Sequence, residues 1–135
     1  MQRDSETAVR DAYAALIEGD VEDLMPLLAL HVEVHVPVSL PFGGIYQGHE
    51  QVEHLARLLG EQFAALALEL ERFVVQGEHV VVLGRLLGRS ARGADFDVTM
   101  AGLWRVEDGL IERYQDLSDT AALLQAIGQP PVTVA

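Results

Sequence analysis

The chain has 135 residues, half of them hydrophobic, which fits one globular domain with a substantial core. Nine arginines, with no lysine, stand against 21 Asp and Glu residues and give a net charge of −12. Nucleic acid and anionic membranes repel so acidic a chain, so we expect neither as a partner. The absence of cysteine excludes disulfides and thiol catalysis.

The ends of the chain predict a cytoplasmic protein. The N-terminal MQRDSETAVRD is polar and lacks the apolar segment of a signal peptide. No apolar run approaches the ~20 residues that span a bilayer. We expect one soluble domain over residues 1–135, with its core at about 6–127 and a flexible tail at 128–135.

The N-terminal third predicts two helices. Apolar residues recur at helical spacing over 5–18, and Asp4 or Ser5 can cap the start. Gly19 ends this helix and Asp20 begins the next. Pro26 lies inside the second helix and predicts a kink or a 3₁₀ end.

The middle of the chain predicts a strand, a loop and a helix. Residues 31–38 alternate between apolar and polar positions, as a half-buried strand does. The following SLPFGGIYQG, residues 39–48, predicts a loop that forms the rim of any pocket. A third helix is expected at about 49–64.

Two strands are expected next. The apolar positions from residue 67 change parity near Arg72, which predicts a β-bulge. Residues 79–89 are apolar on both faces, so we expect a central strand that is covered on both sides. Arg85, among these apolar neighbours, is the second most site-like residue of the chain.

The stretch 95–119, DFDVTMAGLWRVEDGLIERYQDLSD, predicts a long β-hairpin and carries the most site-like feature. Its first strand alternates apolar and polar residues, and Asp108-Gly109 is a strong turn signal. The return strand places Tyr114 and Asp116 on one face, two residues apart. A short helix follows at 120–127, with Asp119 as its cap. The element order predicts an α+β fold in which a long, bent antiparallel sheet holds the helices in its concave side and leaves a cavity at one end.

This order and several local phrases resemble the SnoaL-like branch of the nuclear-transport-factor-2-like superfamily over about residues 6–127. The matching phrases are YAALIEGDVEDLMPLLA, VEVHVP, PFGGIYQGHEQV, VVVLGRLLGR and GLWRVEDGLIERYQDLSDTAAL. The resemblance implies a cone: a strongly curved antiparallel sheet wrapped round about three helices of the N-terminal half, with a pocket at its open end. It also implies a homodimer formed through the outer sheet face.

The resemblance covers enzymes whose catalytic positions can be compared one by one. The general base of ketosteroid isomerase corresponds to Val36, and its protonated aspartate corresponds to Gly102, so steroid-type isomerisation is disfavoured. The family's epoxide hydrolases use two aspartates bridged by an arginine. Asp116 and Arg85 match one aspartate and the arginine, but Leu87 replaces the other aspartate. Polyketide cyclases need one acid/base carboxylate, and Asp116 can serve.

We therefore predict Asp116 and Arg85 as the catalytic residues. Asp116 is either a pocket acid/base or a structural partner of Arg85 or Arg113, and Arg85 either holds a substrate anion or neutralises Asp116. For the aromatic residues Tyr13, Tyr46, Trp104 and Tyr114, the alternative to ligand binding is packing in the core. His35 points to the other strand face, which favours a dimer-interface role. The predicted ligand-binding residues are Tyr13, Val36, Tyr46, Met100, Trp104 and Tyr114.

No metal or cofactor is predicted. HEQVEH, residues 49–54, is one residue longer than the metalloprotease motif, and its two histidines lie about 140° apart on a helix. His31 and His35 share a strand face but stand about 13 Å apart. No phosphate-cradling or dinucleotide-binding glycine motif occurs.

Three functions are compatible with these residues. The leading prediction is acid/base chemistry on a small hydrophobic carbonyl compound: isomerisation, cyclisation or dehydration, with Asp116 as proton carrier. The alternatives are a non-catalytic binding module that keeps the cavity and a dimerisation module that depends on the outer sheet face.

Overall fold

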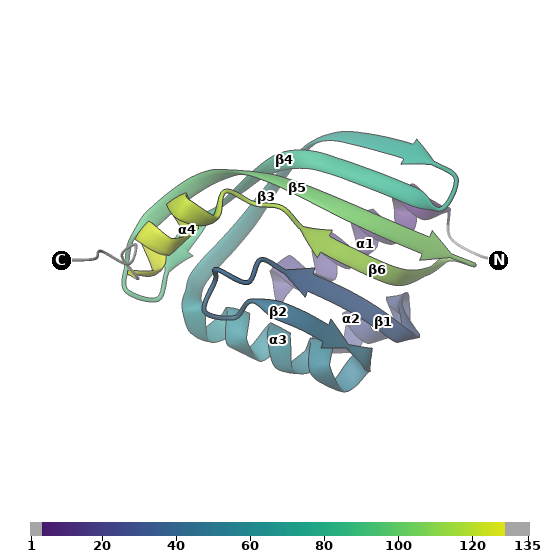
Figure 1. Cartoon of the computed structure of the whole chain (residues 1–135), viewed down its shortest axis with the longest axis horizontal. Helices are drawn as coiled ribbons and strands as arrows, with labels where there is room; N and C mark the ends of the chain where they lie inside the picture. The colour runs from purple at the N-terminus through teal and green to yellow at the C-terminus, as the bar shows by residue number, and fades with distance from the viewer. Residues whose placement is uncertain (1–3, 129–135) are drawn as a thin grey trace.

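A computed structural model of the protein describes residues 4–128 (Figure 1). Its helices are α1 (Ser5–Glu18), α2 (Val21–Leu24), the 3₁₀ helix η1 (Met25–Leu27), α3 (Gly48–Gln62) and α4 (Thr120–Ile127). Its strands are β1 (Leu28–Val36), β2 (Gly44–Gln47), β3 (Phe63–Gln76), β4 (His79–Ser90), β5 (Asp95–Glu107) and β6 (Leu110–Asp116). Within the described residues, no helix is long and apolar enough to cross a membrane.

The predicted helix boundaries are confirmed at the N-terminus. The Asp4 carboxylate accepts a hydrogen bond from the Thr7 main-chain N–H at 2.7 Å and caps α1. Gly19 ends α1 in the left-handed region, at φ 69°. Pro26 lies in η1, which confirms the 3₁₀ end predicted for the second helix.

The six strands form one curved sheet in the order β2-β1-β6-β5-β4-β3 (Figure 1). Neighbours are antiparallel except β1 and β6, which run parallel. The predicted curved sheet is confirmed, and among the described strands β1 and β6 form the one parallel pair in an otherwise antiparallel arrangement. A parallel pair needs a long crossover, which the chain between β1 and β6 supplies.

Two boundaries differ from the prediction. The loop predicted at 39–48 contains β2, which pairs with β1 through Val34 and Tyr46 and extends the sheet by one edge strand. The third helix ends at Gln62, and β3 begins at Phe63 rather than near residue 67. Phe63 is apolar and fits either helix or strand spacing, so its pairing with Ser90 decides the boundary.

The predicted bulge in β3 is confirmed between Leu70 and Arg72, where the pairing with β4 shifts by one residue. A bulge bends its strand, and β3 and β4 curve along their length in Figure 1. Gly84 of β4 lies opposite this bulge, and a Cβ there would overlap the main-chain oxygen of Glu69. The missing side chain therefore permits the close approach of the two strands.

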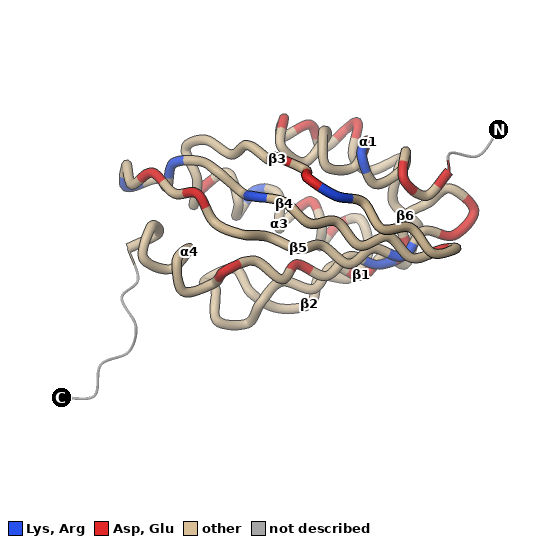
Figure 2. Tube along the Cα trace, turned by 90° about the horizontal axis from the view of Figure 1, so that it is seen from above, with Lys and Arg blue, Asp and Glu red and all other residues tan. Residues whose placement is uncertain are grey.

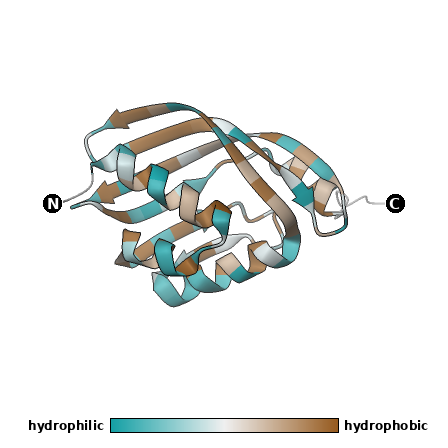
Figure 3. Ribbon diagram, turned by 180° about the vertical axis from the view of Figure 1, so that it is seen from behind, coloured by the Kyte–Doolittle hydropathy of each residue, from teal (hydrophilic) through white to brown (hydrophobic). Residues whose placement is uncertain are grey.

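The helices cover the concave face of the sheet. Figures 1 and 3 show α1, α2 and α3 on one side of it, with α4 at one end. The core between them contains Val9, Ala12 and Tyr13 from α1, Val52 and Leu55 from α3, Val80 and Val82 from β4, Val98, Met100, Trp104 and Val106 from β5, and Leu123 from α4. The apolar stripe of each helix therefore faces the apolar face of the strands.

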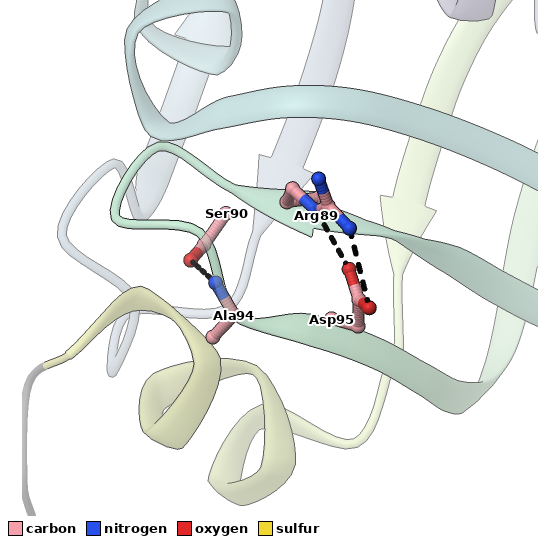
Figure 4. A network of polar contacts seen from close by, with 4 residues as sticks. All are labelled: Arg89, Ser90, Ala94 and Asp95. Carbon is pink, nitrogen blue, oxygen red and sulfur yellow. Dashed lines mark hydrogen bonds and ion pairs between the residues drawn. The ribbon is translucent and has the colours of Figure 1, made fainter.

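The outer face of the sheet is uncovered in the chain, contrary to the prediction that both faces of β4 are buried. Leu83 of β4 is 40% exposed and Leu103 of β5 is 36% exposed. The same face carries charged pairs, of which Arg89–Asp95 closes the β4–β5 end at 2.8 Å (Figure 4). Figure 2 shows acidic positions spread over α1 and the strands. A strand with apolar residues on both faces has the same periodicity whether its second face is covered or exposed, so periodicity alone could not decide this.

The hairpin of β5 and β6 forms as predicted. Asp108 and Gly109 occupy the turn with φ of 52° and 77°, as a two-residue hairpin turn requires. Asp119 caps α4 by accepting from the Ala122 main-chain N–H at 3.2 Å. Of the predicted tail at 128–135, residues 129–135 lie outside the described residues.

Candidate functional site

A cavity of about 130 Å³ lies between the concave sheet face and the helices. Its wall is almost wholly apolar, with contributions from the helices α1 to α4 and from β1, β3, β4, β5 and β6. The side chains that bring polar atoms are Tyr13, Trp104, Tyr114, Asp116 and Ser118. No arginine or histidine is among the lining residues, so Asp116 is the charged group of this wall.

Strand register brings the polar residues together. Trp104 of β5 pairs with Tyr114 of β6, and Gly102 pairs with Asp116, so these side chains share the concave face. Tyr13 reaches them from α1, whose residues Val9 and Ala12 are buried beside it. The two adjacent strands and the helix that crosses them therefore build the site.

Tyr13, Trp104 and Tyr114 form a packed aromatic cluster. The Tyr13 and Trp104 rings lie 4.8 Å apart edge to face, and the Trp104 and Tyr114 rings lie 4.2 Å apart. The Trp104 indole N–H donates to the Tyr13 hydroxyl at 3.1 Å. A Cβ at Gly102 would overlap this hydroxyl. The position that carries the isomerase aspartate in the resemblance is thus filled by a phenol from α1.

Both tyrosines stay protonated at neutral pH. Burial raises the pKa of Tyr13 to about 12. Burial also raises the pKa of Tyr114 well above its ordinary value, helped by the nearby Tyr13 and by the charge of Asp116. Each hydroxyl therefore keeps the proton with which it donates a hydrogen bond, and the Tyr114 hydroxyl donates its proton to Asp116.

Asp116 has hydrogen-bond partners but, within residues 4–128, no cationic partner. Its Oδ1 accepts from the Ser118 hydroxyl at 2.7 Å and from the Tyr114 hydroxyl at 3.3 Å. Burial raises the pKa of this carboxyl, while hydrogen bonds from Ser118 and Tyr114 partly oppose the rise. A carboxylate with a raised pKa at the wall of an apolar cavity is a stronger base than an exposed one, and it can accept and return a proton.

Arg85 does not join Asp116, and this part of the prediction is wrong. Its Nε lies 2.7 Å from Asp97 Oδ1 on the outer sheet face, where Asp97 raises the pKa of the guanidinium. Val82 of the same strand is buried in the core, and Arg85, three positions along, faces outward. Arg113 precedes the inward-facing Tyr114 and also faces outward. Neither arginine therefore neutralises the Asp116 carboxylate. The alternative role predicted for Asp116, a structural ion pair with Arg85 or Arg113, required that one of them did.

The other predicted residues divide between the cavity and its surroundings. Tyr13, Val36, Met100, Trp104 and Tyr114 line the cavity. Tyr46 does not, because its hydroxyl donates to the Phe42 main-chain oxygen at 2.6 Å and anchors the loop whose Phe42 side chain lines the wall.

His35 lies on the outer side, as predicted from strand parity. It borders a separate hollow of about 290 Å³ with Ile45 and Leu117, and this hollow shares Val36 and Asp116 with the cavity. Its Nε2 lies 3.4 Å from Glu33 Oε1 but forms no hydrogen bond there. Its role in a dimer interface stays a prediction.

Sequence reasoning missed Ser118 and most of the α3 wall. Ser118 follows Asp116 by two residues, and an Asp-x-Ser spacing beyond a strand end is the signal that could have indicated the contact. The helix at about 49–64 was predicted, but not that its residues Leu55, Ala56 and Leu59 line the cavity. Their exposure to the cavity depends on how far the helix stands from the sheet, which spacing does not reveal.

The histidines of HEQVEH do not form a metal site in the structure. His49 Nε2 lies 3.0 Å from the Leu28 main-chain oxygen and 3.2 Å from that of Ala29, so it ties α3 to β1. No group of three or more His, Asp or Glu residues within 4–128 is arranged to hold a metal ion.

The family-model comparison matches residues 9–114 to the SnoaL-like domain. The match covers most of the chain, so the protein belongs to the SnoaL-like family, and the fold is that of the nuclear-transport-factor-2-like proteins. No curated protein matches it significantly.

Several solved structures share this fold. A nuclear-transport-factor-2-like protein of unknown function from Burkholderia pseudomallei is 26% identical, with a TM-score of 0.87, and the match covers 94% of this chain and 99% of that one. TerC, co-crystallised with polyporic acid, is 25% identical, with a TM-score of 0.85 and coverage of 91% and 97%. IdmH from Streptomyces antibioticus, a candidate polyketide cyclase, is 22% identical, with a TM-score of 0.77 and coverage of 93% and 99%.

The overlap at Gly102 predicts a sharp loss of stability. In Gly102→Ala the new methyl group displaces the Tyr13 hydroxyl and breaks its bond to Trp104. Overpacking of this kind costs about 1–3 kcal/mol, measured as the free energy of unfolding in urea. Gly60→Ala is the matched control, because a Cβ there meets nothing within 4 Å and a helical alanine gains about 0.5–1 kcal/mol. Equal stability of Gly102→Ala and wild type would contradict the described packing.

The raised pKa of Asp116 predicts that Asp116→Asn increases the stability of the folded state, by an amount that depends on pH. The folded wild type binds this proton more tightly than the unfolded chain, so its stability falls as pH rises from the ordinary Asp value through the raised one. The asparagine keeps Oδ1 as acceptor but carries no charge. Thermal melting from below the ordinary Asp pKa of about 3.9 up to neutral pH should therefore show a variant whose advantage in stability grows as pH rises through the raised pKa and is constant above it.

Asp95→Asn is the control, because its expected effect on stability has the opposite sign. Arg89 lowers the pKa of Asp95, so this carboxylate stabilises the fold above its unfolded pKa. Its replacement should lower the melting temperature slightly at neutral pH. An Asp116→Asn variant that melts below wild type at neutral pH would show that the carboxylate is a structural group.

Proposed function

We propose that the protein is an acid/base enzyme that isomerises, cyclises or dehydrates a small hydrophobic carbonyl compound. One observation carries the proposal: an isolated carboxylate with a raised pKa lies at the wall of an apolar cavity. Burial without a cationic partner costs stability, and groups whose pKa is so perturbed are concentrated at functional sites.

The cavity wall supports two halves of such a reaction. Asp116 takes a proton from the carbon beside the carbonyl and returns it to another atom of the same compound. Negative charge then develops on the carbonyl oxygen, where a protonated phenol can donate a hydrogen bond. Tyr13 is the better placed donor for this role, because the Tyr114 hydroxyl already donates to Asp116.

The neighbours support a small organic ligand. TerC was crystallised with polyporic acid, and IdmH is a candidate polyketide cyclase. The cavity of about 130 Å³ is close to the ~150 Å³ of an apolar cavity that holds benzene. Compounds built on one six-membered ring, with a single polar group for Asp116 and Tyr13, therefore suit its size and chemistry.

A non-catalytic binding module is the competing function, and one observation favours it. Val36 and Gly102 hold no carboxylate, so a single acidic group must both take up and deliver the proton. A module that only sequesters a compound needs the cavity and no second acid.

Asp116→Asn separates the two functions. The measurement is thermal melting and product formation with a panel of cyclic ketones and enones, for wild type and variant. A bound compound at a hundredfold excess over its dissociation constant stabilises the folded state by about 2.7 kcal/mol. We expect wild type to bind and convert a panel member, and the variant to bind it with a rate at least ~100-fold lower.

Leu110→Arg is a suitable control for this experiment, because Leu110 is exposed and does not line the cavity. It should bind and convert the compound like wild type. Compounds that bind wild type and variant equally and are converted by neither would establish the binding module. Conversion that survives in Asp116→Asn would remove Asp116 from the mechanism.

We also propose that two copies pair through the outer sheet face. Leu83, Leu103 and Val74 are exposed on β4, β5 and β3, and the cross-strand pairs Val81–Leu103 and Leu83–Ala101 make this apolar area continuous. Exposed apolar area of this kind marks contact surfaces. His35 and Ile45 would lie at its β1–β2 margin.

Leu103→Arg should convert the dimer to a monomer, measured by sedimentation equilibrium. Arginine reduces the net charge of −12, so dissociation cannot come from greater overall repulsion. Leu30→Arg is the control, since Leu30 is 73% exposed at the irregular start of β1. A monomeric wild type, or dimers in both variants, would contradict this interface.

A further inference from the structure

The two oxygens of Asp116 have different surroundings. Both side-chain hydrogen bonds, from Ser118 and from Tyr114, reach Oδ1. No side chain within the described residues donates a hydrogen bond to Oδ2. Because two donors already point at Oδ1, a proton on Asp116 is better placed on Oδ2.

Ser118 is the stronger of the two donors by geometry. Its hydroxyl lies 2.7 Å from Oδ1, the usual length of a hydrogen bond to a carboxylate, whereas the Tyr114 hydroxyl lies 3.3 Å away. Ser118 also lines the cavity, directly after β6 and before α4. It therefore restrains the carboxylate at the place where the strand ends and the chain turns into α4.

We propose that Ser118 is a positioning residue, which holds Asp116 Oδ1 and leaves Oδ2 as the oxygen that exchanges a proton with the ligand. The inference rests on the proposed function. In the first step the ligand C–H bond breaks, its electron pair stays with the ligand as an enolate, and the proton forms an O–H bond with Oδ2. In the second step Oδ2 returns the proton, so Asp116 ends as it began.

Few groups around Asp116 can otherwise change its titration. Tyr13 from α1 and Tyr114 from β6 remain protonated at neutral pH. His35 from β1 borders the outer hollow that Asp116 also touches. No other charged side chain is among the residues that line the cavity or this hollow.

The test compares Ser118→Ala with Ser118→Thr in the full chain. The first readout is the ¹³C chemical shift of the Asp116 carboxyl carbon against pH in the free protein, assigned by its loss in Asp116→Asn. The Ser118 hydroxyl and the Ser118 main-chain N–H both lower the pKa of Asp116, the hydroxyl by more, and alanine removes only the hydroxyl, so Ser118→Ala should move the titration midpoint upward. Threonine keeps a hydroxyl and should restore it towards wild type. Ser39→Ala, an exposed serine away from the cavity, should leave the midpoint unchanged.

The second readout is the pH dependence of kcat with a compound that wild type converts. The acidic limb should move upward with the carboxyl midpoint in Ser118→Ala, and the rate at low pH should fall by the factor by which the ionised fraction falls. A structural role alone would lower stability without moving either midpoint. An unmoved titration in a folded Ser118→Ala protein would overturn the inference, as would equal shifts in Ser118→Ala and Ser118→Thr.

The two readouts separate failure of this inference from failure of the proposed function. The carboxyl titration needs no ligand, so it tests the restraint by Ser118 directly. If the titration midpoint shifts but no compound is converted, the proposed enzymatic function is wrong and the contact between Ser118 and Asp116 is supported. If wild type converts a compound but the Asp116 midpoint does not move in Ser118→Ala, the positioning role of Ser118 is wrong and the enzymatic function is supported. Should Ser118→Ala not fold, Tyr114→Phe removes the other donor to Oδ1 and must shift the midpoint in the same direction.

Discussion

The packing of α1 across β5 and β6 is the interaction on which the site depends. Tyr13 meets Trp104 edge to face, and its hydroxyl occupies the space that Gly102 leaves open. This contact joins the N-terminal helix to the two strands that carry Asp116. It also satisfies the buried indole N–H and a buried phenol together, so the polar atoms of the cluster cost little to bury. The cavity extends from this cluster along the same concave face.

The carboxylate beside the cluster has the opposite character. Hydrogen bonds from Ser118 and Tyr114 only partly offset the loss of hydration, and the pKa stays raised. Arg85, a predicted partner of this carboxylate, lies on the outer face and pairs there with Asp97. A protein built only for stability would place an apolar or paired group here. The separation of the arginines from the cavity therefore leaves the pKa of Asp116 raised, which the proposed acid/base function requires.

Strand parity explains both the successful and the unsuccessful site predictions. Along β5 and β6 one face is apolar and the other polar, so Trp104, Tyr114 and Asp116 could be placed on the concave face from the sequence. Along β4 both faces are apolar, so strand parity could not tell whether Arg85 lies on the concave face or on the outer face. Only the register with β5, in which Arg85 pairs with Thr99, places it on the outer face beside Asp97.

The sequence by itself determined the helix caps, the bulge near Arg72, the turn at Asp108-Gly109 and the side-by-side position of Tyr114 and Asp116. Each of these depends on neighbours within a few residues, where backbone preference and side-chain spacing act directly. The tertiary structure alone decided the parallel pairing of β1 with β6, the face of Arg85, the distance of Tyr46 from the cavity and the approach of Tyr13 to Gly102. These depend on how segments far apart in the chain pack against one another, and residue spacing carries no information about that separation.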